Sequence, residues 1–236
     1  MPGLTLALHG LASLRDAAGA TEVDLPAAAM LAELAGVDVV RLAVSEDLKP
    51  VREDDIRDVR RAARRLELRL PPSQALVKVA LEGRPHRVVL AAEGRAPGAP
   101  AAPLDLSGRG APLEPVVRTL AEAGIPSCAV VAPDLDAVKR VHAESIPALE
   151  FYTGSLVDLP PSERGPELER LGDAVRLASK LQLAIGLGGG LSFRNLTEVL
   201  TTCPAAEWVT IGRSALARGF LVGLDRALRD LRARIA

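Results

Sequence analysis

Eight short apolar runs alternate along the chain with longer amphipathic segments, and this alternation restricts the fold more than any other feature of the sequence. The runs are nearly continuous in Val, Leu, Ile and Ala, as expected of strands that are covered on both faces. Strands that alternate with helices form a parallel sheet with the helices outside, and eight such units close most economically into a barrel. We therefore predict the α/β class, as a single (β/α)8 TIM barrel. The strands are expected at 4–9, 39–44, 66–70, 87–92, 127–132, 148–153, 182–188 and 207–212.

The segments between these runs carry signals for the beginnings and ends of helices. Pro26 stands in the first turn of a predicted helix that Gly36 ends, and Ser73 is placed to cap the start of another. Acidic residues open the segment 53–65 and arginines close it, which suits the helix dipole. The predicted helices cover 26–36, 53–65, 73–83, 113–124, 133–144, 162–180, 192–202 and 214–235.

One connection is much longer than the others. It covers residues 93–112, "EGRAPGAPAAPLDLSGRGAP", and is rich in Pro, Gly and Ala. A connection of this length in a compact domain is typical of a functional lid or a mobile segment. Because nothing else in the chain reads as a linker, we predict one domain over residues 1–236, a length that such barrels commonly have.

The charge balance and the absence of targeting signals exclude several classes of protein. The 29 basic and 30 acidic side chains leave no basic excess for nucleic acid, and the arginines of 57–65 are read as a solvated helix face. No apolar run approaches the roughly 18 residues that a membrane span needs, and the N-terminus does not resemble a signal peptide. Cys128 and Cys203 are expected to be buried free thiols. The expected protein is cytoplasmic and binds neither nucleic acid nor a membrane.

The turns after the last two strands are the strongest candidates for a ligand site. Barrel ligands bind at the carboxyl ends of the strands, and the turns after strands 7 and 8 commonly hold a phosphate. Here Gly188, Gly189 and Gly190 follow the seventh run, and Gly212 and Arg213 follow the eighth. Backbone N–H groups at glycines can face an anion, and the start of the following helix adds its positive end. These five residues are our predicted phosphate site; the alternative is that the glycines only turn the chain.

The ends of the other strands carry few candidate catalytic side chains. Glu150 on the sixth strand is the candidate general base, and its candidate proton partner is His9 at the end of the first strand or Tyr152 on the sixth. Arg69, Tyr152 and Thr153 are expected to line the substrate pocket. No lysine ends a strand, which disfavours Schiff-base chemistry. No His, Cys, Asp or Glu cluster has the spacing of a metal motif, so we expect no metal and no cofactor.

Eight motifs, in order along nearly the whole chain, resemble the pyridoxine 5′-phosphate synthase family of vitamin B6 biosynthesis. The resemblance implies a barrel that condenses 1-deoxyxylulose 5-phosphate with 3-amino-2-oxopropyl phosphate. It also implies general acid–base residues, two phosphate sites and assembly as octamers, hence a homo-oligomer here. The motifs are "LASLRDAAG", "AAMLAELAGVD", "SEDLKPVREDDIRDVR", "RTLAEAGI", "PDLDAVKRV", "EFYTG", "GLGGGLSFRN" and "TIGRSALARGFLVGLDRAL".

The chain departs from this family at the positions that carry the chemistry. The family's histidine on the second strand falls on Ala43, its glutamate on the third strand falls on Arg69, and the histidine of its glycine-rich loop falls on Gly189. Phosphate-holding residues of the second loop fall on Ser45 and Pro50. The histidine after the eighth strand falls on Arg213, and the Asn-x-Asp-His that ends the first strand falls on residues 7–10. The matching positions are Glu150, Thr153, Gly188, Gly190 and Gly212.

Three hypotheses follow for the function. The first, which we rank highest, is a catalytically impaired homologue that still binds a phosphorylated small molecule or inorganic phosphate, or that acts through its oligomer. The second is an active enzyme that makes pyridoxine 5′-phosphate or performs another phosphosugar reaction with Glu150 and His9. The third is a structural or interaction protein built on the barrel oligomer.

Overall fold

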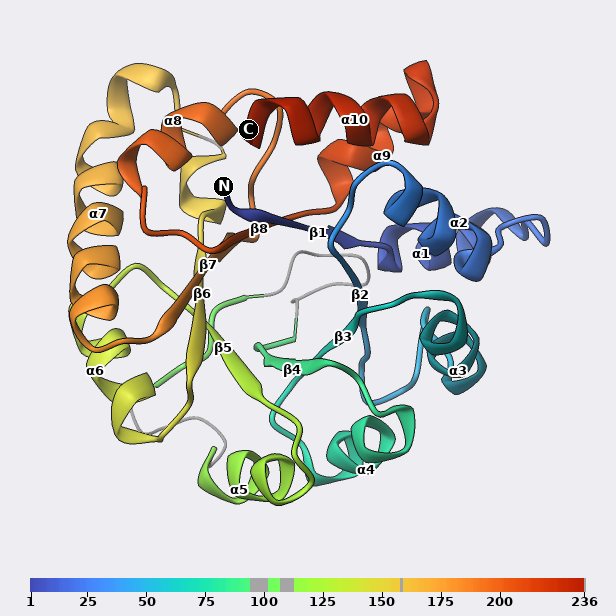
Figure 1. The fold of residues 1–236 in the computed structure, drawn as a ribbon, viewed down its shortest axis with the longest axis horizontal. Coiled ribbons are helices and arrows are strands. Elements are labelled where there is room, and N and C mark those ends of the chain that lie inside the picture. The colour runs from blue at the N-terminus through green and yellow to red at the C-terminus, as the bar shows by residue number, and fades with distance from the viewer. Residues whose placement is uncertain (94–101, 107–112, 158, 236) are drawn as a thin grey trace.

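Eight parallel strands close into a barrel in chain order, each strand pairing with the next and β8 pairing with β1 (Figure 1). The computed structural model describes residues 1–93, 102–106, 113–157 and 159–235. Each of the eight predicted runs overlaps one strand, so the (β/α)8 fold is confirmed. The strands are β1 Gly3–Ala7, β2 Val39–Ala43, β3 Leu66–Leu70, β4 Arg87–Leu90, β5 Ser127–Val131, β6 Ala148–Tyr152, β7 Ala184–Gly188 and β8 Trp208–Ile211.

Helices surround the barrel on its outer side (Figure 1). Their apolar faces pack on the strands and form one large core of Leu, Val, Ile and Ala. Short 3-10 turns follow β6, at Gly154–Leu156 and Pro161–Glu163. The α-helices are α1 His9–Ala18, α2 Leu25–Leu34, α3 Glu53–Ala62, α4 Gln74–Gly83, α5 Glu114–Glu122, α6 Leu135–Ala143, α7 Gly165–Lys180, α8 Leu196–Thr202, α9 Arg213–Val222 and α10 Leu224–Ile235.

The inside of the barrel is a second, smaller core. Alternate residues of each strand point inward, and there Trp208 packs with Cys128 and Val130. A Cβ built on Gly186 would overlap the indole ring of Trp208. Glycine at this position of β7 therefore makes room for the only tryptophan of the chain.

Two sequence predictions were wrong at the ends of elements. The first strand was expected to reach His9, but it ends at Ala7, and His9 instead begins the unpredicted helix α1. The segment 214–235 was expected to be one helix, but Gly223, with φ of 86°, separates α9 from α10. The positive φ is disfavoured for residues with a Cβ, so glycine permits the break here. After this break α10 packs on α2 and α8 as well as on α9.

Smaller differences concern where the other helices begin and end. The helix predicted from residue 192 begins only at Leu196, because Asn195 Oδ1 accepts the Ser192 N–H (2.8 Å) and holds the preceding turn. The helix predicted to residue 65 ends at Ala62. Ser73 does precede α4, but its side chain makes no capping hydrogen bond.

Most of the predicted long connection, 93–112, lies outside the described residues. Within it, Ala102 exchanges two backbone hydrogen bonds with Ala92, and Leu104 N donates to Val130 O at 2.8 Å. Cys128 and Cys203 are buried and free, as predicted. Among the described residues no helix combines the length and apolarity that crossing a membrane requires.

Candidate functional site

The two glycine-containing turns predicted to hold a phosphate lie next to each other. They follow β7 and β8, which pair in parallel, so their carboxyl ends meet at the same face of the barrel. The turns are also joined directly, since Phe193 N lies 3.4 Å from Ser214 Oγ. The carboxyl face of the barrel, which we call the mouth, therefore brings together residues that the sequence separates.

The mouth presents backbone N–H groups that have no partner among the described residues. Gly212 precedes α9 without a side-chain cap, and the first helical bond is Leu216 N to Gly212 O at 3.1 Å. This leaves the N–H groups of Arg213, Ser214 and Ala215 free, as at any uncapped helix start. Such a start favours an anion, because its N–H groups and its dipole both point to the ligand.

The glycine run after β7 also serves the protein's own packing. Gly189 has φ of 87°, which glycine adopts without strain. A Cβ on Gly188 would overlap the Glu150 carboxylate, and a Cβ on Gly189 would overlap the Tyr152 ring. The space where these glycines lack side chains is therefore filled by two side chains of β6, which the sequence did not indicate.

Glu150, the candidate general base, is buried inside the barrel and fully occupied by donors. Arg41 binds it through both ends of its guanidinium, at 2.8 and 2.7 Å. Thr210 Oγ1 donates at 2.7 Å and Trp208 Nε1 at 3.1 Å. Burial alone would raise the pKa of Glu150, but the charge and hydrogen bonds of Arg41, with those of the two other donors, lower it to about 2. The carboxylate is thus ionised and held in place.

The contacts of Glu150 belong to a larger network that crosses the barrel interior. Arg41 Nε donates to Glu67 at 2.8 Å, and Arg87 Nε donates to the other oxygen of Glu67 at 2.9 Å. The guanidinium of Arg87 also lies 4.0 Å from the centroid of the Trp208 ring. Two cations thus balance two anions, as burial of charge requires. Sequence reasoning missed this network; its only signal was charged residues inside apolar strands.

No hydrogen bond joins His9 to Glu150 among the described residues. Its Nδ1 is buried and has no hydrogen-bond partner among the described residues. Burial, and then the nearby charges of Arg69, Arg41 and Arg213, lower the pKa of His9 to about 3. The imidazole is therefore neutral at neutral pH.

Arg69 stands at the carboxyl end of β3, level with Ala43 of β2 and Val89 of β4. It is half-buried and has no hydrogen bond or ion pair with any described residue. Burial and the charge of Arg41 lower its pKa to about 10, against the opposing effect of Glu150, so it remains charged at neutral pH. His9 follows β1, Arg69 stands near the carboxyl end of β3 and Arg213 follows β8, so all three lie at the mouth.

The remaining predicted pocket residues have different environments. Thr153 is buried, and both its N–H (2.7 Å) and its hydroxyl (2.9 Å) donate to Gly188 O, which ties the turn after β6 to β7. Gly190 O accepts from the Asn195 side chain at 3.1 Å. Tyr152 is half-buried against Gly189. Within the described ranges no cluster of His, Cys, Asp and Glu could hold a metal ion.

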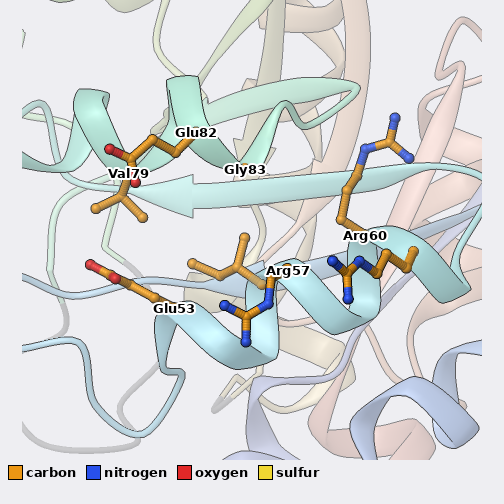
Figure 2. Close-up of a pocket in the computed structure, with 8 residues that line it drawn as sticks. Glu53, Arg57, Arg60, Val79, Glu82 and Gly83 are labelled. Carbon is orange, nitrogen blue, oxygen red and sulfur yellow. The ribbon is translucent and has the colours of Figure 1, made fainter.

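A separate groove lies on the outside of the barrel between α3 and α4 (Figure 2). It encloses about 270 Å³. Arg57 on its rim pairs with Asp54 at 2.6 Å, and Arg60 donates to Arg84 O at 2.9 Å. These arginines are exposed and already partnered, as a solvated helix face would have them, and the groove is distinct from the mouth.

Comparison with known proteins agrees with the resemblance seen in the sequence. Residues 4–236 match the family model described as "Pyridoxal phosphate biosynthesis protein PdxJ". The chain is 32% identical over 237 residues to the pyridoxine 5′-phosphate synthase of Desulforapulum autotrophicum, covering 100% of this chain and 99% of the relative. It is 33% identical over 233 residues to that of Geobacter metallireducens, covering 98% and 97%.

Solved structures share the fold at lower identity. A 4-hydroxy-2-oxoglutarate/2-dehydro-3-deoxyphosphogluconate aldolase superposes with a TM-score of 0.65 at 18% identity, over 99% of this chain and 94% of its own. A tryptophan synthase from M. tuberculosis gives 0.64 at 10% identity, over 99% and 92%. At these identities the likeness concerns the barrel alone.

Proposed function

Because the chain belongs to the pyridoxine 5′-phosphate synthase family, we propose that it is a member that binds a phosphorylated ligand at its mouth while lacking most of the family's acid–base chemistry. The observation that carries the proposal is the state of the two candidate catalytic side chains. Glu150 is held by Arg41 with a pKa of about 2, and His9 is neutral with a pKa of about 3.

The catalytic half of the proposal follows from these pKa values. A general acid or base works best when its pKa lies near the operating pH, and each such residue contributes about 10²–10⁴ in rate. The low pKa values of Glu150 and His9 match neither group to proton transfer at neutral pH, and the position of the family's third-strand glutamate carries the cation Arg69. Gly189 cannot take a histidine without displacing Tyr152. Ring closure therefore lacks its proton carriers.

The binding half is supported by the donors of the mouth. The uncapped start of α9 and the N–H groups of Gly189 and Gly190 can face one anion. Arg213 is exposed beside them and adds a positive charge. The ligand in this proposal is a phosphate ester or inorganic phosphate.

A thermal-shift titration with inorganic phosphate and pyridoxine 5′-phosphate tests the binding half. We expect both to raise the Tm of the wild type and to stabilise Arg213→Gln less. Arg61→Gln is the matched control, because Arg61 is an exposed arginine of α3 whose ion pair with Asp58 is long, at 3.9 Å. A Tm that neither ligand changes would refute phosphate binding.

The alternative of an active synthase is favoured by the match over the full length of the curated relatives. It predicts that both family substrates, incubated with the protein at high concentration, give pyridoxine 5′-phosphate above a blank without protein. If the protein is a catalytically impaired member, no pyridoxine 5′-phosphate should form above the blank. If the wild type forms product and a folded Glu150→Gln variant does not, the protein is an active enzyme.

The predicted homo-oligomer remains a prediction of this proposal. Phe220 and Leu221, at the end of α9, are 70% and 85% exposed, and Leu34 of α2 is 78% exposed. Large exposed apolar side chains of this kind are frequent at protein interfaces. Sedimentation equilibrium of the wild type and of Phe220→Glu/Leu221→Glu would show whether this surface holds copies together.

A further inference from the structure

Arg69 differs from the other arginines that face the barrel interior. Arg41 and Arg87 each bind a carboxylate at hydrogen-bond distance. Arg69 is half-buried, yet no described residue gives it an ion pair or a hydrogen bond. A guanidinium that loses water without gaining a partner is unfavourable. The structure thus holds a cation that has no partner among the protein groups it describes.

Among the described residues no carboxylate lies within ion-pair distance of Arg69. Its neighbours in the sheet register are the apolar Ala43 and Val89. Glu150 is bound by Arg41, and Glu93, in the loop after β4, accepts the Glu46 N–H at 3.2 Å. The other ionisable groups that act on this part of the mouth, His9, Arg41 and Arg213, carry no negative charge.

His9 provides a second unsatisfied group at the same place. The residue begins α1 directly after β1, and the nearby charge of Arg69 lowers the pKa of its ring. Its buried Nδ1 has no partner among the described residues. A neutral imidazole has one N–H donor and one acceptor nitrogen. An oxygen anion bound by Arg69 could accept that N–H as well, so one ligand group would satisfy both side chains.

We propose that Arg69 and His9 form a second anion subsite at the mouth, and that the ligand is a phosphate ester that also carries a carboxylate. This inference rests on the proposed function, in which the start of α9 and Arg213 hold the phosphate. The subsite supplies a single positive charge, that of Arg69, since His9 is neutral. A carboxylate carries one negative charge and balances it, whereas a phosphate ester would carry more than one. The flat guanidinium also matches a carboxylate with two parallel hydrogen bonds.

Isothermal titration calorimetry with paired probes tests the proposal. The probes are 2-phosphoglycolate and 3-phosphonooxypropanoate, each compared with the alcohol that lacks its carboxylate, 2-hydroxyethyl phosphate and 3-hydroxypropyl phosphate. We expect at least one acid to bind about 10-fold or more tightly than its alcohol, as charge-assisted hydrogen bonds imply. Arg69→Gln should remove this preference and leave the affinity for the alcohols unchanged. Arg61→Gln, the exposed control on α3, should keep the preference.

Each other outcome overturns a distinct statement. Equal affinity of acids and alcohols for the wild type would refute the carboxylate subsite and leave the phosphate site standing. Tighter binding of 1,3-propanediol bisphosphate than of both acids, lost in Arg69→Gln, would refute the carboxylate in favour of a second phosphate. Failure of every phosphate ester and of inorganic phosphate to bind would refute the proposed function itself. A preference that survives in Arg69→Gln would refute the role of Arg69.

Discussion

Replacing Arg41 with Met removes the cation that holds Glu150 inside the barrel, and we expect it to destabilise the protein strongly. Arg41 is 1% exposed and Glu150 is 3% exposed, so water cannot replace the lost partner. Breaking a buried ion pair from one side costs about 3–5 kcal/mol. For a chain of this size each kcal/mol lowers Tm by about 2–4 °C. Multiplying the lower limits of these two ranges and then the upper limits gives an expected decrease in Tm of roughly 6–20 °C.

The effect should depend on pH in a defined direction. The folded pKa of Glu150, about 2, lies below its ordinary value of 4.5. Its contribution is therefore present above about pH 4.5 and is lost as the pH falls toward 2; at about 1.4 kcal/mol per pH unit the total is about 3 kcal/mol. In Arg41→Met only the hydrogen bonds of Thr210 and Trp208 still oppose the effect of burial, so the pKa of Glu150 rises and the carboxyl takes up a proton. The stability difference between the two proteins should shrink from pH 7 to pH 4.5.

Urea unfolding at both pH values, followed by the fluorescence of Trp208, provides the assay. Trp208 is the only tryptophan and is 7% exposed inside the barrel, so its signal reports on this region. Arg57→Met on the outer face of α3 is the control, because its exposed pair with Asp54 should contribute less than about 1 kcal/mol. A loss below about 1 kcal/mol in Arg41→Met at pH 7, or an equal loss at both pH values, would refute the reasoning.

Three further substitutions test the packing and the charges around the mouth. Gly186→Ala should lose about 1–3 kcal/mol in urea unfolding, because its methyl group would overlap Trp208; wild-type stability would show that the indole ring can move aside. Gly189→Ala should lose a similar amount, since its φ of 87° and its contact with Tyr152 both exclude a Cβ, and an unchanged midpoint would contradict this. Arg69→Gln should raise the stability without ligand by about 1 kcal/mol, because it removes an unpaired half-buried charge; a lower Tm would mean that Arg69 has a stabilising partner.

The barrel could be predicted from the sequence because its signal is local and repeated. Each strand is a short apolar run, and all eight were found in order. The predictions of the first strand's end and of one helix over 214–235 were wrong because, at His9 and at Gly223, a single residue determines whether the element continues or ends. His9 could extend a strand or begin a helix by its own preference, and only the folded context decides.

The network of the barrel interior could not be predicted in the same way. Arg41 and Glu150 are separated by 109 positions, and nothing in either local segment indicates the other. Their pairing depends on the registers of neighbouring strands around the closed barrel, from β2 to β6. The sequence showed a conspicuous carboxylate on the sixth strand, which is typical of a catalytic base. That Glu150 is an ionised, hydrogen-bonded carboxylate is evident only from the structure, which shows the four hydrogen bonds it accepts from Arg41, Trp208 and Thr210.

The central statement, a mouth that binds phosphate esters without converting them, can be tested in one ³¹P NMR experiment. The protein is incubated with 1-deoxyxylulose 5-phosphate and 3-amino-2-oxopropyl phosphate while the spectrum is followed over time. We predict that a substrate resonance shifts or broadens when protein is added, less so with Arg213→Gln, and that no resonance of inorganic phosphate or pyridoxine 5′-phosphate grows. Growth of both product resonances with the wild type would contradict the claim that the substrates are not converted. Substrate resonances that the protein leaves unchanged would refute the claim that the mouth binds phosphate esters.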